Sequence, residues 1–135
     1  MNNLLILKSR IGIFRKVDDS VGEVTFSGTH DATVEEIKEF TLGMNEIMNH
    51  QPYYVINLLS TNLGSFSPEI WHYVGADKEA NAYIEGSVVV TKSLGYKLQI
   101  TIFFKKYKPV YPRTIVETKE EAYTWINKLK SFISE

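Results

Sequence analysis

The stretch "YYVINLLSTNLGSFSPEIW", residues 53–71, decides how the fold is interpreted. It opens with a nearly continuous apolar run, Tyr53–Leu59, which contains two aromatic and two β-branched side chains. Such a run is typical of a strand that is covered on both faces, as in the middle of a mixed sheet. Ser67 and Pro68 then supply an N-cap and a first helical residue. The stretch therefore predicts a central strand, a connection and a helix.

The segment before it predicts a hairpin and a helix. Residues 4–28, "LLILKSRIGIFRKVDDSVGEVTFSG", have two apolar arms joined by the turn residues Asp18, Asp19 and Ser20. A helix is expected to begin after Thr33, because Thr33 and Glu36 form a capping box, and to end near Asn49. Its apolar face consists of Val34, Ile37, Thr41, Met44 and Met48.

The segment after it predicts two more strands and a last helix. The strands are "YIEGSVVVT", residues 83–91, and the extended piece "RTIVET", residues 113–118. The last helix begins at a Thr118–Glu121 capping box. Its apolar face contains Ala122, Trp125, Ile126, Leu129, Phe132 and Ile133. Alternation of helices and strands after an opening hairpin indicates an α/β fold with helices packed on a mixed sheet.

Residues 93–106 fit two secondary structures by local pattern. Tyr96, Leu98, Ile100 and Ile102 alternate as in a strand, whereas Leu98, Ile102 and Phe103 also form a helical stripe. Both possibilities remain open on this evidence.

Length and composition narrow the class of protein. A chain of 135 residues is expected to form a single domain, residues 1–135. Fifteen basic and sixteen acidic side chains argue against nucleic-acid binding, which usually needs a basic excess. The chain has no cysteine, and its first residues match neither a signal peptide nor a membrane span. A cytoplasmic protein is the expectation.

Three patterns resemble the STAS-like superfamily, and within it a group of small stand-alone bacterial proteins. They are residues 53–71 after a capped helix, "TKSLGYKLQITIFFKKYKP" at residues 91–109, and "PRTIVETKEEAYTWI" at residues 112–126. The likeness extends from about Gly22 to Leu129. It implies an N-terminal hairpin, a mixed β-sheet and about four α-helices packed on the sheet. It also implies a helix at residues 93–106.

The resemblance also implies a regulatory or protein-interaction function. In the antagonists of anti-sigma factors, a serine at the start of the helix after a central strand is phosphorylated. Ser60 and Ser65 lie near the comparable position here and are the candidate phosphoacceptors. Asn57 stands where that group often has an acid, and no Asp-Ser pair follows.

Residues 92–113 are the one strongly asymmetric stretch of charge. They contain five lysines and one arginine without an acid, interleaved with phenylalanine and tyrosine. Lys105, Lys106, Lys108 and Arg113 are therefore candidates for a face that binds an anionic ligand, a lipid head group or an acidic partner. In the alternative interpretation, the lysines are a solvated rim and the aromatic rings belong to the core.

No residue pattern predicts catalysis, a metal site or a cofactor. The histidines lack metal-ligand spacing, and each pair of carboxylates is explained by a turn or by the first turn of a helix. The favoured hypothesis is a non-enzymatic STAS-like module that binds a protein partner or itself, as in a homodimer. The alternative is a carrier of a small molecule or lipid with an aromatic-lined cavity beneath the second and third helices. Peripheral contact with lipid is compatible with both hypotheses.

Overall fold

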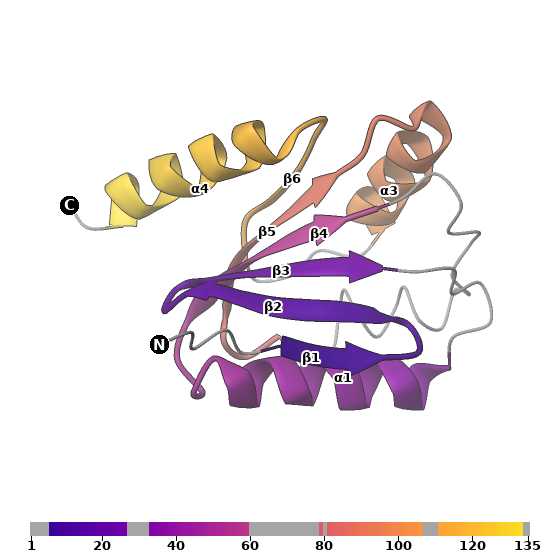
Figure 1. Ribbon diagram of the computed structural model, residues 1–135. Helices are drawn as coiled ribbons and strands as arrows, with labels where there is room; N and C mark the ends of the chain where they lie inside the picture. Colours follow the sequence, from indigo (N-terminus) through magenta and orange to yellow (C-terminus); the bar gives the residue numbers. More distant parts are fainter. Residues whose placement is uncertain (1–5, 27–32, 60–78, 80, 107–110, 134–135) are drawn as a thin grey trace.

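The computed structural model describes residues 6–26, 33–59, 79, 81–106 and 111–133, and these form an α/β fold (Figure 1). The strands are β1 (Ile6–Ser9), β2 (Gly12–Asp18), β3 (Val21–Phe26), β4 (Tyr53–Leu58), β5 (Ile84–Val90) and β6 (Arg113–Val116). The helices are α1 (Val34–Ile47), α3 (Leu94–Lys106) and α4 (Lys119–Ile133). About four helices are expected from the resemblance, and the described residues contain three. The helix expected after Ser67 lies outside them.

The six strands form one mixed sheet in the order β1-β2-β3-β4-β5-β6. The pairs β1–β2 and β2–β3 are antiparallel, and the pairs β3–β4, β4–β5 and β5–β6 are parallel. β4 lies between two parallel neighbours, and its first four residues, Tyr53–Ile56, are buried. The prediction of a central strand covered on both faces is confirmed.

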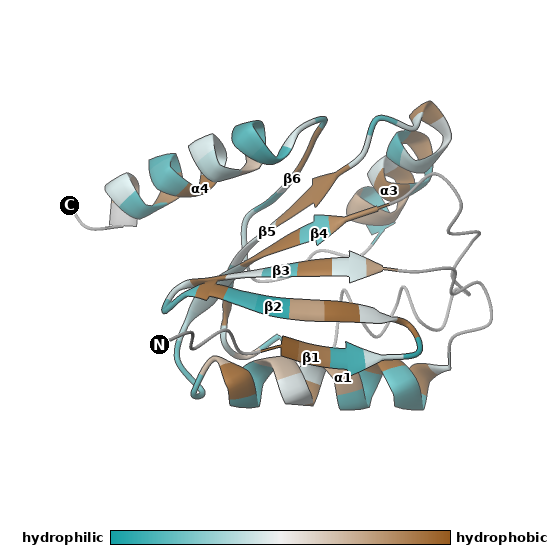
Figure 2. Ribbon diagram, viewed as in Figure 1, coloured by the Kyte–Doolittle hydropathy of each residue, from teal (hydrophilic) through white to brown (hydrophobic). Residues whose placement is uncertain are grey.

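Each face of the sheet has its own apolar cluster. On one face α1 packs through Ile37, Phe40, Met44 and Met48 against Ile11, Phe14, Val24, Tyr53 and Val55. On the other face α4 packs through Ala122 and Ile126 against Val21, Tyr54, Ile56 and Val88. Figure 2 shows largely apolar β5 and β6, whereas α4 alternates between apolar and polar residues. The side chains of β4 point alternately to the two faces, so Tyr53 and Val55 belong to the α1 core and Tyr54 and Ile56 to the α4 core.

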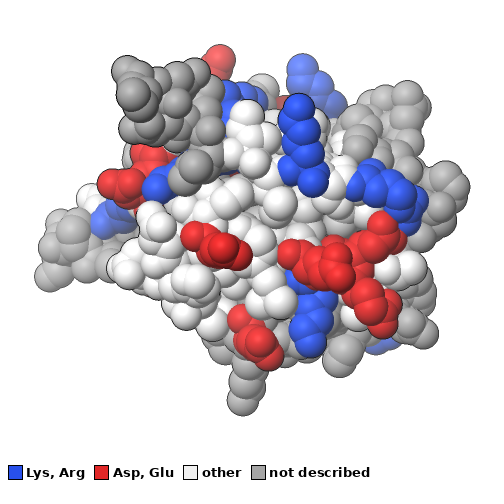
Figure 3. Space-filling view, turned by 60° about the horizontal axis from the view of Figure 1, so that its bottom comes forward, with Lys and Arg blue, Asp and Glu red and all other residues white. Residues whose placement is uncertain are grey.

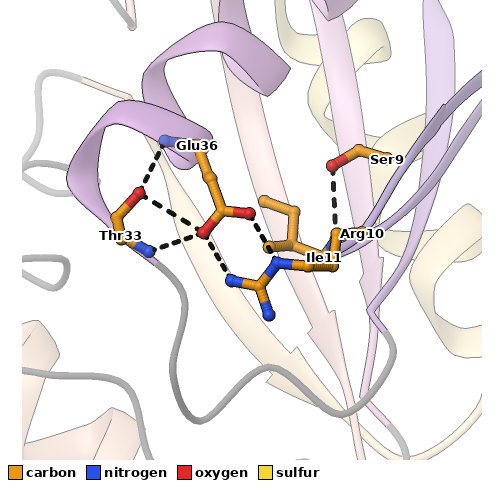
Figure 4. Close-up of polar contacts among 5 residues, drawn as sticks. All are labelled: Ser9, Arg10, Ile11, Thr33 and Glu36. Atoms are coloured by element: carbon orange, nitrogen blue, oxygen red, sulfur yellow. Dashed lines mark hydrogen bonds and ion pairs between the residues drawn. The ribbon is translucent and has the colours of Figure 1, made fainter.

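The predicted capping box of α1 is present. Thr33 Oγ1 accepts a hydrogen bond from Glu36 N at 3.1 Å, and Glu36 Oε1 accepts one from Thr33 N at 3.0 Å (Figure 4). The outer side of this helix is acidic, with Glu35, Glu39 and Glu46. Figure 3 shows acidic side chains grouped around uncharged surface on the side of the molecule where α1 lies.

A second turn divides the first predicted hairpin arm. Residues 19–20 form the expected turn between β2 and β3, but residues 10–11 form another turn between β1 and β2. Ser9 Oγ accepts a hydrogen bond from Ile11 N at 3.2 Å within this turn. Arg10 donates two hydrogen bonds to the Glu36 carboxylate, at 2.7 and 2.5 Å, and so ties the turn to the start of α1. The sheet therefore gains an edge strand that the sequence pattern does not predict.

Residues 94–106 are helical, as the resemblance implies and against the local strand alternation. Ser93 caps the helix, since its Oγ accepts a hydrogen bond from Tyr96 N at 3.2 Å. α3 lies on the same sheet face as α1. Arg113 contacts α3 and pairs with Ser87 of β5. The Ser87 hydroxyl accepts a hydrogen bond from Asn57, whose side chain points away from the α4 cluster because it alternates with Ile56 along β4.

Candidate interaction surfaces

The structure describes only some of the predicted site residues. Ser60, Ser65 and Lys108 lie outside the described residues, so the phosphoacceptor interpretation stays a prediction. Lys105 and Lys106 are exposed in the last turn of α3. Arg113 begins β6 and is half-buried. The candidate anionic-ligand face therefore has two exposed lysines at a helix end and one arginine beneath them.

Arg113 makes structural contacts to α3. Its Nη2 donates a hydrogen bond to the backbone carbonyl of Phe104 at 2.5 Å, which satisfies a carbonyl near the end of the helix. Its guanidinium lies 4.1 Å from the centre of the Phe104 ring and 5.7 Å from that of Phe103. Burial lowers the pKa of Arg113. These contacts bind the helix to β6.

α3 carries a row of exposed apolar side chains. Leu94, Leu98 and Ile102 are 70%, 58% and 67% exposed, whereas Ile100 and Phe103 are buried. The spacing of four residues places the exposed three on one side of the helix. The predicted helical stripe is thus split, because Phe103 faces the core and its two supposed partners face outward.

A second exposed apolar surface covers the outer half of the sheet. Ile6, Ile13 and Val17 are 46%, 43% and 38% exposed. They lie on one face: Ile6 pairs with Arg15, and Ile13 is two residues from Arg15 along β2. Val17 lies at the bulge opposite Val21, a residue of the α4 face. This is the face on which α4 packs, but α4 lies mainly over β4, β5 and β6 and reaches β3 at Val21 and Glu23. We call Ile6, Ile13 and Val17 the open sheet patch.

A buried carboxylate marks the border between the α4 layer and the open sheet patch. Glu23 of β3 is 5% exposed and accepts hydrogen bonds from Tyr123 Oη at 2.6 Å and Arg15 Nη2 at 2.9 Å. Lys119 Nζ lies 3.3 Å from Glu23 Oε1. Burial alone would raise the pKa of Glu23, but these hydrogen bonds and charges lower it. Burial and the bond to Glu23 raise the pKa of Tyr123. With two cations and a phenol satisfying it, Glu23 is a cross-link between sheet and helix.

A buried tyrosine, Tyr53, and a partly buried one, Tyr111, lie on the opposite face. Tyr53 Oη donates a hydrogen bond to Asn45 Oδ1 at 2.7 Å, and Tyr111 Oη donates one to Asn81 Oδ1 at 3.3 Å. Burial raises the pKa of Tyr53, and it raises that of Tyr111 to about 12. Both phenols stay neutral and hydrogen-bonded, which suits a structural role. The cavity predicted beneath the second and third helices involves residues outside the described part of the chain.

Asn57 stands where the resemblance places an acid, and its amide is engaged within the sheet. Nδ2 donates to Ser87 Oγ at 3.0 Å and to the Val88 carbonyl at 3.2 Å. An acid here would lack these donor hydrogens and would place a charge against the Val88 carbonyl. The asparagine therefore fits the polar contacts around it.

Within the described ranges, no three histidine, aspartate or glutamate side chains group as metal ligands would. No helix among the described elements is long and apolar enough to cross a membrane. No protein family, curated protein or solved structure matches the chain significantly.

Proposed function

We propose that this chain is a non-enzymatic, STAS-like interaction module that pairs with a second copy of itself through β1 and the open sheet patch. The observation that carries the proposal is the position of three exposed β-branched side chains, Ile6, Ile13 and Val17, beside an edge strand. A regulatory role, phosphorylation at Ser60 or Ser65 and a cytoplasmic location belong to the same proposal and rest on the resemblance.

The backbone of β1 supports pairing. β1 is the last strand of the sheet at its end of the described order, so one side of its backbone has no neighbouring described strand. Such an edge presents N–H and C=O groups that another strand can bond. β1 carries neither proline nor a bulge, two common features that block such pairing. Its one charged side chain, Lys8, lies on the face of Ile13 and weakens the pairing of two copies.

The side chains favour a second copy as the partner. An antiparallel pair of β1 strands about a two-fold axis is self-complementary, because each strand offers the other the same backbone groups. Ile6 and Ile13 of the two copies would then lie on one continuous sheet face. Arg15 is already neutralised by Glu23 at 2.9 Å, which limits repulsion between the copies.

The small size of this surface predicts weak self-association. Stable interfaces bury about 800 Å² on each partner. A strand of four residues that carries Ile6, with Ile13 and Val17 on the next strand, reaches that area only with help from neighbouring residues. We therefore expect a reversible dimer whose population depends on protein concentration.

Amide hydrogen exchange at several protein concentrations tests the proposal. The outward-pointing amides of β1 should become protected as concentration rises, because a second β1 strand bonds them. β6, the strand at the other end of the sheet, is the internal control, and its exchange should not change. Concentration-independent exchange throughout β1 would contradict the proposal.

A further inference from the structure

We propose that the outer side of α3 is a docking surface for an anionic membrane, independently of self-association through β1. The proposal rests on a row of apolar side chains and on the sign of the charges around it. Leu94, Leu98 and Ile102 form the row, and Lys105 and Lys106 stand at its end. We call these five residues the α3 ridge.

The helix geometry keeps the ridge together. At about 100° per residue, Leu94, Leu98 and Ile102 occupy an arc of about 80°, and Lys105 falls inside the same arc. Lys106 lies about 40° beyond Ile102. The remaining exposed residues of this side are Gly95, Gln99 and Thr101, which are uncharged. The ridge is thus a continuous apolar line that ends in positive charge.

The buried side of α3 fixes this orientation. Ile100 is 2% and Phe103 is 7% exposed, so they anchor the helix on the protein. Arg113 binds the Phe104 carbonyl and stacks beside the ring, which holds the last turn. Because these contacts occupy the inner side, the ridge cannot turn inward without breaking them.

Charge selects an anionic surface as the occupant. α3 has three lysines and no acid, and the nearest acids along the chain are Glu85 and Glu117. Glu117 is paired with Lys97, which also lowers the pKa of Glu117. The inner side of α3 is also apolar, so the helix as a whole is not strongly amphipathic, but its outer side presents leucine and isoleucine beside lysines, the groups that interfacial helices offer to lipid. Negative lipid head groups would attract the lysines while the three apolar side chains enter the boundary of the acyl chains.

On α1, the other helix of this sheet face, the charges around an exposed apolar side chain have the opposite sign. α1 also exposes a leucine, Leu42, at 40%, but the exposed charges of α1 are Glu35, Glu39 and Glu46 against the single cation Lys38. α1 contacts β1, whereas α3 is bound to β6 through Arg113, so the two helices lie at opposite ends of the sheet (Figure 1). An anionic surface would therefore be attracted at α3 and repelled at α1.

Vesicle binding tests the proposal directly. The full chain should co-sediment with vesicles of phosphatidylcholine and phosphatidylserine at low ionic strength, and much less with phosphatidylcholine alone. High salt should weaken the binding, because the attraction to lysines is screened. Failure to bind the anionic vesicles, or equal binding to both, would overturn the proposal.

Matched variants separate the ridge from the rest of the surface. The double substitution Leu98→Gln and Ile102→Gln should lower the partition coefficient at least about tenfold, because two inserted apolar side chains are lost. Lys105→Gln should lower it about fivefold. Leu42→Gln and Lys38→Gln on α1 are the controls and should leave it unchanged. Normal binding by the double variant would refute the assignment of the ridge.

A labelled side chain gives a readout that does not depend on affinity. The chain has no cysteine, so Leu98→Cys provides a unique site for an environment-sensitive dye. Its emission should shift to the blue on adding anionic vesicles, as expected when the dye enters an apolar layer. The same dye at Leu42→Cys should not shift. A shift at both sites, or at neither, would contradict docking through α3.

Discussion

Tyr123 Oη lies 2.6 Å from Glu23 Oε2, and this hydrogen bond joins α4 to β3 across 100 residues of sequence. The bond lies at the boundary between the part of the sheet face that α4 covers and the open sheet patch. Glu23 is buried, so the loss of a donor leaves a charged group less well satisfied.

Tyr123→Phe is therefore expected to lower the free energy of unfolding at neutral pH by about 1.5–3 kcal/mol, the range for hydrogen bonds to charged groups. Urea unfolding monitored by circular dichroism measures the change. Thr124→Ala, at the next residue and on the exposed side of α4, is the control and should lower the free energy of unfolding by less. Equal stability of Tyr123→Phe and the parent chain would show that the bond contributes nothing.

The same pair predicts a pH dependence. The pKa of Glu23 is lowered in the folded chain, so its contribution to stability is present above the unfolded pKa. That contribution is lost as pH falls through the folded pKa. Tyr123→Phe removes one cause of the lowering, so the two chains should differ at neutral pH and converge in acid. A constant difference at all pH values would argue against this linkage.

The lowered pKa of Glu36 predicts a second loss of stability at acid pH. The hydrogen bond from Arg10 and the bond from Thr33 lower the pKa of Glu36 from 4.5 to about 2. Stability from this group should thus be complete above about pH 4.5 and lost as pH falls toward 2. Carbon-detected NMR titration of the carboxylate gives the value directly. Arg10→Gln should raise it, and an unchanged titration would mean that Arg10 has no influence.

Two glycines predict opposite effects of the same substitution. A Cβ at Gly22 would lie 2.3 Å from two ring atoms of Phe14, which is fully buried. Gly22→Ala should therefore lower the free energy of unfolding by about 1–3 kcal/mol. At Gly95 in α3 the nearest atom would be 3.8 Å away, so Gly95→Ala should raise it by up to about 1 kcal/mol. Urea unfolding of both variants compares the signs, and destabilisation by Gly95→Ala would contradict the open space around it.

Local chemistry made much of the fold predictable. The Thr33–Glu36 capping box and the apolar run at Tyr53 are signals within a few residues, and both elements lie where the sequence places them. The turn at Arg10 is not predictable in this way, because its partner Glu36 is 26 residues away. For that reason the sequence pattern predicts a single hairpin arm where the structure has two strands, β1 and β2.

The surfaces were harder to predict than the elements. Phe132 belongs to the predicted apolar face of α4 yet is 78% exposed, since periodicity does not reveal where the sheet beneath a helix ends. Glu23 is the converse case, because its burial depends on Tyr123 and Lys119 from the far end of the chain. Charge alone singles out the lysines of α3, but the exposure of the apolar row beside them depends on which side of the helix faces the sheet.

Sedimentation equilibrium over a range of protein concentrations tests the proposed self-association most directly. The parent chain should rise from 15.5 kDa toward twice that mass, and the rise should be reversible on dilution. Ile13→Lys in the open sheet patch should hold the mass at 15.5 kDa, whereas Leu42→Lys on α1 should behave as the parent chain. A parent chain that stays at the single-chain mass at every concentration, or an Ile13→Lys chain that dimerises equally well, would contradict the account.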